Sequence, residues 1–150
     1  MLIETKNINE ARKQIEKAFK EKKKVIVKAQ NPEFNRKILE NKKVSVLLSP
    51  ELTGEIRKEK LKERDSGLNE VLCRIAAKNK IAIGIDIKEI LKTKGKERAI
   101  LLSRVMQNIK LCKKTGAEIK VFGNYDEKNL FSLFSTLGAS NSQIRKAIEA

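Results

Sequence analysis

Apolar residues in the first third of the chain switch repeatedly between helical and strand-like spacing. Residues 9–21 place Ala11, Ile15, Ala18 and Phe19 on one helical face, which predicts an amphipathic helix. The segments that follow indicate, in order, a strand "KVIVKAQ", a short helix "NPEFNRKILEN" with Pro32 in its first turn, and a strand "KVSVLLS". This pattern predicts single helices that alternate with single strands.

The central stretch "RDSGLNEVLCRIAAKNKIAIGIDI", residues 64–87, carries both periods in succession. Its first part has apolar residues at the i, i+3, i+4, i+7 and i+8 positions of a core-facing helix, namely Leu68, Val71, Leu72, Ile75 and Ala76. Asn79 is expected to end this helix in the left-handed conformation. The run "IAIGIDI" then alternates isoleucine with small or polar residues, which is typical of a strand buried on both faces, as in parallel sheets.

The rest of the chain continues the alternation. We expect a short helical turn at "KEILK", a long helix from about Glu97 to Lys114 that Gly116 ends, and a strand at "AEIKVF". Asp126 is expected to cap the next helix, and Ser140 with Gln143 to form a capping box for the last one.

Helices that alternate with single strands imply a parallel sheet of βα units joined by right-handed crossovers. The four segments above indicate strands, and "LIET" near the start predicts a fifth. The fold class is therefore α/β, in a single domain over residues 1–150, with a sheet that is either open or an abbreviated TIM-like barrel. A complete eight-stranded barrel is excluded because it takes about 250 residues.

Charge is the most unusual feature of the composition. The chain holds 34 Lys and Arg against 19 Asp and Glu, a formal net charge of +15. Such an excess predicts a polyanionic partner, with nucleic acid ahead of an anionic membrane. The chain has five Phe, one Tyr and no Trp, so few aromatic side chains remain to stack on bases. Contacts with the polyanion should therefore depend on charge and shape.

Targeting signals and cysteines indicate a compartment. No apolar run is long enough to cross a bilayer and no signal-peptide stretch is present, which predicts a cytoplasmic protein that binds no membrane. Cys73 and Cys112 fall within helical apolar patterns, and we interpret them as buried thiols rather than a disulfide. Both observations fit a reducing cytosol.

The absence of histidine limits the catalytic chemistry that the chain could perform. It excludes Ser-His-Asp and Cys-His nucleophilic sites and histidine-ligated metals, and the sequence has no GxxxxGK[ST] or GxGxxG motif. A carboxylate-dependent metal phosphoesterase is the remaining catalytic hypothesis, with Asp86 and Asp126 as candidate ligands. Because each aspartate directly precedes a helical segment, we favour the alternative that both cap helices.

Basic residues gather in several places that could contact a polyanion. Arg74 and Lys78 share the polar face of one predicted helix. Lys113 and Lys114 end the long helix, where cations also suit the helix dipole. Further lysines precede the first firm strand, at residues 22–24.

The segment of residues 49–67 follows a strand and is dense in charge. It contains Arg57, Lys58 and Arg64. Ligand sites in α/β sheets gather after the carboxyl ends of strands, and long loops inside compact domains are often functional. We give equal weight to a binding loop and to a solvated surface segment.

The central stretch also resembles a known family. "GLNEVLCRIAAKNKIAIGI" is similar to archaeal ribonuclease P protein component 3, in which a Gly-Leu-Asn start leads to a helix ending in Ala-x-x-Asn and a strand reading Ile-Ala-Ile-Gly. Upstream, "FNRKILENKKVSVLLSPE" resembles the family's Asn-Arg helix and Val-x-x-Leu strand. Downstream, "LCKKTGAEIKVFGN" and "LFSLFSTLGASNSQIRKAI" resemble its later helix, strand and closing helices. The resemblance extends from about Val25 to Ile148.

The resemblance implies a barrel-like α/β fold related to polymerase-and-histidinol-phosphatase domains, without their metal-binding histidines. It also implies a protein subunit of the ribonucleoprotein that removes the 5′ leader from precursor tRNA. In that family the RNA subunit is the catalyst and uses magnesium, so the protein is expected to bind no cofactor itself. The implied partners are the ribonuclease P RNA, protein component 2 and the other protein subunits, with precursor tRNA contacted indirectly. A ribosome-associated RNA-binding domain is a third hypothesis beside the phosphoesterase.

The residues that match the family's motif are mostly of structural types, and they are Asn35, Arg36, Gly67, Leu68, Asn69, Ala76, Asn79, Ala82 and Gly84. The chain is shorter than the family, and Ser45 and Asp86 stand where the family commonly has an acid and a small hydroxyl residue. The polar motif residues and the basic clusters together give the candidate RNA contacts Arg36, Arg57, Lys58, Arg64, Asn69, Arg74, Lys78, Lys113 and Lys114. We expect no catalytic or metal-binding residue in the protein itself.

Overall fold

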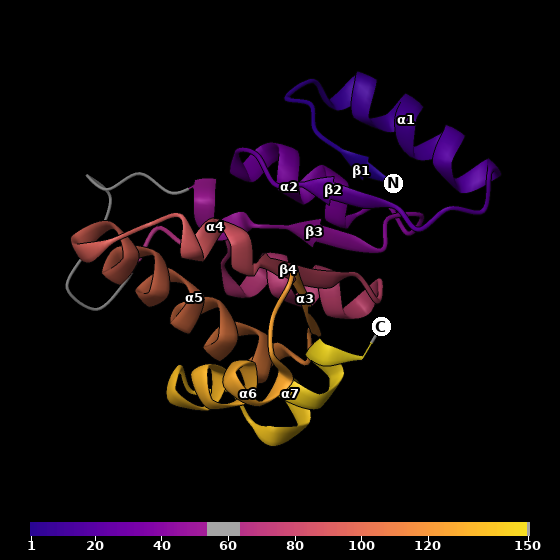
Figure 1. The fold of residues 1–150 in the computed structure, drawn as a ribbon. Coiled ribbons are helices and arrows are strands. Elements are labelled where there is room, and N and C mark those ends of the chain that lie inside the picture. Colours follow the sequence, from indigo (N-terminus) through magenta and orange to yellow (C-terminus); the bar gives the residue numbers. More distant parts are fainter. Residues whose placement is uncertain (54–63, 150) are drawn as a thin grey trace.

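The computed structural model describes residues 1–53 and 64–149, and its strands form one parallel sheet (Figure 1). The strands follow one another across the sheet in chain order, and each neighbouring pair is parallel. They are β1 (Leu2–Ile3), β2 (Ile26–Lys28), β3 (Val46–Leu48), β4 (Ala82–Asp86) and β5 (Ile119–Phe122). Within the described residues, β1 and β5 form the two edges and do not pair with each other. The α/β prediction is confirmed, the fifth strand at "LIET" is present, and the sheet is open.

The helices are α1 (Ile8–Lys20), α2 (Pro32–Leu39), a short 3-10 helix η1 (Pro50–Thr53), α3 (Glu70–Lys78), α4 (Ile87–Leu91), α5 (Gly95–Thr115), α6 (Glu127–Thr136) and α7 (Asn141–Ile148). Local side-chain chemistry sets several of their ends. The Ser140 hydroxyl accepts from the Gln143 N–H at 3.2 Å, and the Gln143 amide oxygen accepts from the Ser140 N–H at 3.0 Å. Gly116 ends α5 with φ 83°. The predicted capping box and the predicted end of α5 are therefore confirmed.

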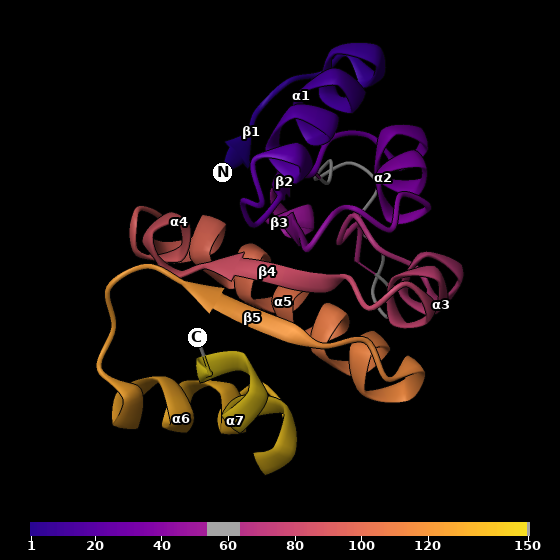
Figure 2. The same ribbon diagram turned by 90° about the vertical axis from the view of Figure 1, so that its right-hand side faces the viewer.

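The main core lies between one face of the sheet and the helices that connect its strands. Ile83 and Ile85 of β4 are 0% and 1% exposed, and they belong to one cluster with apolar residues of α1, α2, α3 and α5. Right-handed crossovers between sequential strands place successive helices on the same face, which accounts for this arrangement. Figure 2 shows β4 and β5 side by side with arrowheads pointing the same way, α5 behind them, and the α6–α7 pair beyond β5.

The opposite face of the sheet packs tightly around Gly84. A Cβ atom at this position would lie 2.8 Å from Val46 Cγ1, 2.9 Å from Leu48 Cδ1 and 3.0 Å from Phe122 Cε2. Glycine therefore allows side chains from β3 and β5 to approach β4. The structural role expected for Gly84 is confirmed.

Two apolar residues predicted to face the core are exposed. Phe19 is 52% exposed, because it lies in the last turn of α1 beside the buried stripe, and the Lys43 ammonium nitrogen lies 5.3 Å from its ring centre. Val71 is 55% exposed, since Leu72 and Cys73 occupy the buried face of α3 at that level. In both cases the spacing correctly predicted a helix, but the residue lies outside the buried face of that helix.

The end of α3 also differs from the expectation. Asn79 has φ −91°, and the left-handed residue is Lys80, with φ 56°. The Asn79 side-chain amide instead donates to the Leu39 carbonyl oxygen at 2.7 Å, which ties α3 to α2. The residue was expected to act on its own helix, and it acts between two helices.

Candidate nucleic-acid interface

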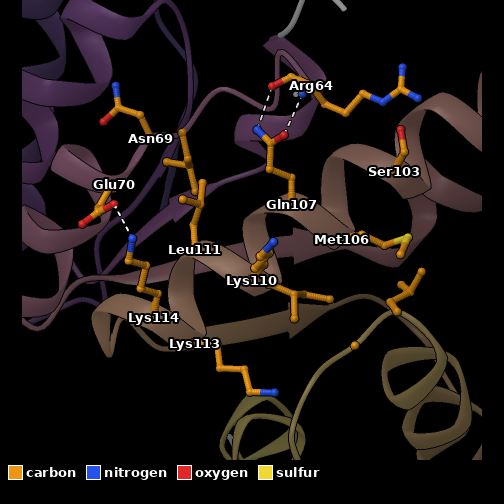
Figure 3. A pocket seen from close by; sticks show the side chains of 14 residues that line it. Arg64, Asn69, Glu70, Ser103, Met106, Gln107, Lys110, Leu111, Lys113 and Lys114 are labelled. Atoms are coloured by element: carbon orange, nitrogen blue, oxygen red, sulfur yellow. Dashed lines mark hydrogen bonds and ion pairs between the residues drawn. The ribbon is translucent and has the colours of Figure 1, made fainter. Parts of the chain in front are cut away.

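A groove of about 710 Å³ runs between the start of α3 and α5, with the segment after α6 along one side (Figure 3). We refer to it as the α3–α5 groove. The groove is lined in part by four of the predicted RNA contacts, namely Arg64, Asn69, Lys113 and Lys114. The structure thus brings together residues that are up to fifty positions apart in the sequence.

The segment before α3 is held against α5 by side-chain amides. Gln107 of α5 accepts from the Arg64 N–H at 2.6 Å and donates to the Arg64 carbonyl oxygen at 2.7 Å (Figure 3). Asn108, 1% exposed, donates to the Ser66 carbonyl oxygen at 3.0 Å. These bonds fix the backbone of Arg64, whose side chain extends along α5 toward Ser103 (Figure 3).

Gly67 allows the same segment to pack on η1. Its φ is 79°, and a Cβ atom here would lie 2.1 Å from the Pro50 carbonyl oxygen. Only glycine combines this left-handed conformation with so close an approach. The motif residue Gly67 therefore has a structural role, in which it positions Arg64 and Asn69 at the mouth of the groove.

Glu70 forms ion pairs with two basic residues that were predicted as RNA contacts. Its carboxylate accepts from Lys114 Nζ at 2.8 Å and from Arg74 Nε at 3.2 Å, and thereby joins α3 to the end of α5. The hydrogen bond from Lys114, followed by that from Arg74, lowers the pKa of Glu70 to about 2. The carboxylate thus stays ionised at neutral pH and offsets part of the positive charge, which leaves Lys110 and Lys113 as exposed lysines of the groove without an ion pair among the described residues.

Asn69 is the N-cap of α3. Its side-chain oxygen accepts from the Leu72 N–H at 2.9 Å, while the residue as a whole is exposed. Its oxygen is therefore engaged in the fold, and its amide nitrogen forms no hydrogen bond with the described residues.

The remaining predicted contacts lie elsewhere. Arg36 is exposed on α2, where its Nε donates to Glu40 at 3.1 Å, and Lys78 is exposed at the other end of α3. Arg57 and Lys58 lie outside the described residues. Sequence reasoning missed Lys110 and Gln107. Lys110 could have been found, because it lies three and four positions before Lys113 and Lys114 on the same helix.

The two aspartates that could have served a metal phosphoesterase are helix caps. Asp86 accepts from the Lys88 N–H at 3.0 Å at the start of α4, and Asp126 accepts from the Asn129 N–H at 2.9 Å at the start of α6. The favoured interpretation of both residues as caps is confirmed.

The groove offers ammonium and guanidinium groups beside apolar side chains. Met106, 46% exposed, lines it, and no aromatic residue from 1–53 or 64–149 is among the lining residues. Such a surface can bind phosphates by charge and can pack against a partner, but it offers no ring on which a base could stack. None of the helices within residues 1–53 and 64–149 combines the length and apolarity needed to cross a bilayer.

Comparisons with known proteins give consistent matches, although no protein-family model matches the chain. The chain is 31% identical over 112 residues to ribonuclease P protein component 3 of Methanococcus maripaludis, which covers 75% of this chain and 44% of that relative. It is 37% identical over 90 residues to ribonuclease P protein component 3 of Methanosarcina acetivorans, which covers 60% of this chain and 34% of that relative. The chain thus spans less than half the length of these relatives.

A solved structure agrees with these sequence matches. A chain of the cryo-EM structure of archaeal ribonuclease P with mature tRNA is similar to this chain with a TM-score of 0.78 and 27% sequence identity, over 97% of this chain and 62% of that chain. The resemblance inferred from the central motif is confirmed. This chain is therefore a homologue of archaeal ribonuclease P protein component 3.

Proposed function

We propose that this protein is an RNA-binding subunit of ribonuclease P that helps a catalytic RNA to remove the 5′ leader of precursor tRNA. The observation that carries the proposal is its similarity to component 3 over 75% of its own length. The likeness to a chain from an archaeal ribonuclease P structure with mature tRNA supports it. Because the chain spans less than half of its relatives' length, their assembly and activity are part of the proposal.

The chemistry of the side chains supports assistance rather than catalysis by the protein. The chain has no histidine, and its candidate aspartates are engaged as helix caps. A net charge of +15 suits a protein that neutralises phosphates, so that segments of a folded RNA can approach one another. We expect magnesium to act at the RNA subunit, and protein component 2 to be the direct protein partner.

Reconstitution tests this function. Cleavage of precursor tRNA is measured with ribonuclease P RNA and the other protein subunits, with and without this protein, over a series of magnesium concentrations. The protein alone should not cleave, and its addition should raise turnover and lower the magnesium concentration needed for half-maximal cleavage. Equal turnover in both mixtures would contradict the proposal, as would magnesium-dependent cleavage by the isolated protein.

Two controls separate a specific subunit from a generic polycation. An unrelated basic protein of similar size and charge should not raise turnover. The double variant Lys110→Gln/Lys113→Gln removes two exposed charges from the α3–α5 groove, and Lys88→Gln/Lys128→Gln removes two exposed charges from the starts of α4 and α6. Stimulation should fall in the groove variant and persist in its matched control.

A further inference from the structure

The turns that lead from a helix into a strand are unusually rich in lysine. These segments, residues 20–25, 40–45, 78–81 and 113–118, precede β2, β3, β4 and β5. Their lysines form what we call the lysine rim, which consists of Lys20, Lys22, Lys23, Lys24, Lys42, Lys43, Lys78, Lys80, Lys113 and Lys114. All are exposed except Lys43, which is partly buried. The acidic residues of the same segments are Glu21, Glu40 and Glu118.

The sheet places these segments next to one another. The Ser45 N–H donates to the Val25 carbonyl oxygen at 2.8 Å, the Ala82 N–H to the Ser45 carbonyl oxygen at 3.0 Å, and the Ile83 N–H to the Glu118 carbonyl oxygen at 2.8 Å. Because all strands are parallel, they all begin on the same side of the sheet, and every turn before a strand lies there. We call this side the amino edge of the sheet. Neighbouring strands are about 4.8 Å apart, so the rim extends over about 14 Å from β2 to β5. One strand of a nucleic-acid duplex presents about four phosphates over that length.

Two rim lysines occupy a backbone position that favours glycine. Lys22 and Lys80 have φ 57° and 56° directly after the C-caps of α1 and α3. Gly138 has the equivalent place after α6, with φ 98°. The hydrogen bonds are also equivalent, because the next N–H reaches back five residues in each turn, from Lys23 to Ala18, from Ile81 to Ala76 and from Ala139 to Phe134. A residue with a side chain is strained in this conformation, and glycine would adopt it at a lower energetic cost. The chain nevertheless has lysine at both positions.

Much of the rim's charge has no ion-pair partner in the part of the chain that the structure describes. Lys23 pairs with Glu21, Lys43 with Glu16 and Lys114 with Glu70. The rim members without an ion pair to any residue within 1–53 and 64–149 include Lys22, Lys42, Lys78, Lys80 and Lys113. These ammonium groups are available to an external anion.

Helix dipoles explain only part of this distribution. A cation in the last helical turn is favourable, which accounts for Lys20, Lys78, Lys113 and Lys114. It does not explain why lysine replaces glycine after two helices. The described carboxyl ends of the strands are mixed in charge, since Glu51, Asp86 and Asp126 lie there or just after them together with Lys28, Lys88 and Lys128.

We infer that the lysine rim binds the phosphate backbone of a structured RNA, as one continuous site along the amino edge of the sheet. The site meets the α3–α5 groove at Lys113 and Lys114 and extends the contact surface across the turns before β2, β3 and β4. It takes phosphates rather than bases, because ammonium groups predominate on the rim, and the two rings beside it, Phe19 and Phe122, already lie next to the rim lysines Lys43 and Lys24. The inference rests on the proposed function for the identity of the RNA.

The double variant Lys22→Gly/Lys80→Gly gives the sharpest test, because it removes two charges and relieves two strained positions at once. It should unfold at a urea concentration equal to or higher than the parent, which separates its effect on binding from any loss of fold. Binding of labelled ribonuclease P RNA is measured by fluorescence anisotropy over a series of potassium chloride concentrations. The variant should bind at least tenfold more weakly at low salt, and its salt slope should be shallower by about 1.8, or about 0.9 for each phosphate that a lysine no longer neutralises.

The matched control Lys88→Gln/Lys128→Gln removes the same number of charges away from the rim, and it should retain the affinity and the slope of the parent. Equal losses in both variants would mean that only net charge matters, and unchanged binding in the glycine variant would mean that the rim is not used. Either result overturns the inference. If the parent raises turnover in the reconstitution while the glycine variant binds and stimulates equally well, the inference fails and the proposed function stands. A parent that neither binds the RNA nor raises turnover removes both.

Discussion

Replacement of Glu51 by glutamine should stabilise this protein at neutral pH and remove most of the pH dependence of its stability. Glu51 lies in η1, directly after β3, and is 1% exposed. Neither of its carboxylate oxygens has a hydrogen-bond partner among the described residues. Burial raises the pKa of Glu51 to about 8; the backbone N–H of the residue itself opposes this increase, and the nearby negative charges of Asp86 and Glu89 add to it.

The magnitude follows from the difference between the folded and unfolded pKa values. In the unfolded chain the carboxyl has its ordinary pKa of 4.5. Between that value and about 8 the folded state keeps a proton that the unfolded state has released, so the free energy of unfolding falls as pH rises. One pKa unit corresponds to about 1.36 kcal/mol, so Glu51 destabilises the fold by about 3 kcal/mol at pH 7. The effect is absent well below pH 4.5 and complete above about pH 8.

Urea unfolding at a series of pH values between 5 and 8 measures this effect. The free energy of unfolding of the parent should fall by about 3 kcal/mol across the series because of Glu51 alone. The Glu51→Gln variant should lack this decrease. The chain has no histidine, so few other groups titrate in the same window. In the variant, the glutamine side chain buries N–H donors that lack hydrogen-bond partners. This lowers the stabilisation gained by the substitution by about 1–2 kcal/mol at every pH, so the pH dependence of the free energy of unfolding does not change.

Glu70→Gln provides the control. The pKa of Glu70 is lowered to about 2 by Lys114 and Arg74, so this carboxylate is ionised in both the folded and the unfolded state through most of the series. Its variant should follow a profile parallel to that of the parent. Parallel profiles for the parent and Glu51→Gln would refute the reasoning, since they would mean that the buried carboxyl has an ordinary pKa.

Other predictions can be checked on the isolated protein. Gly67→Ala should lower the free energy of unfolding by about 2–4 kcal/mol, because its Cβ would collide with a backbone carbonyl oxygen of η1, whereas Gly138→Ala should lower it by only about 1 kcal/mol in urea unfolding. Asn69→Ala should cost about 1 kcal/mol through loss of the cap on α3, and Asn69→Asp should restore most of it in the same measurement. Cys73 and Cys112, 0% and 1% exposed, should react with a thiol reagent only after urea unfolding, so fast labelling of the native protein would contradict their burial.

Features that depend on neighbouring residues in the sequence could be predicted from it. Features that depend on contacts between residues far apart in the sequence could not. The parallel sheet follows from helical and strand periods that alternate, and the caps at Asp86 and Asp126 follow from their place directly before helices. The α3–α5 groove depends on the bonds between Gln107 and Arg64, which are separated by 43 positions. No local pattern indicates such a pairing.

The candidate site was predicted only in part for the same reason. Arg64, Asn69, Lys113 and Lys114 share the groove, whereas Arg36 lies on α2 and Lys78 lies outside the groove, on the lysine rim. Charge identifies residues that could contact RNA, but it does not say which of them the fold brings together. Burial of Glu51 was equally invisible, because a glutamate in a charged segment is ordinarily solvated.

The wrong prediction at Asn79 bears on the lysine rim. Asparagine tolerates the left-handed conformation better than lysine does, and it lies one position before the turn that needs it. The structure uses the Asn79 amide to bind the Leu39 carbonyl oxygen and leaves the left-handed position to Lys80. Packing between α3 and α2 therefore fixes where the turn falls, but it does not require a lysine there, since glycine would fit the same turn as Gly138 does after α6. Glycine would also fit the turn at Lys22. At both turns, therefore, the chain has a lysine that the backbone conformation disfavours. An anion bound outside the protein provides a reason for lysine at both positions.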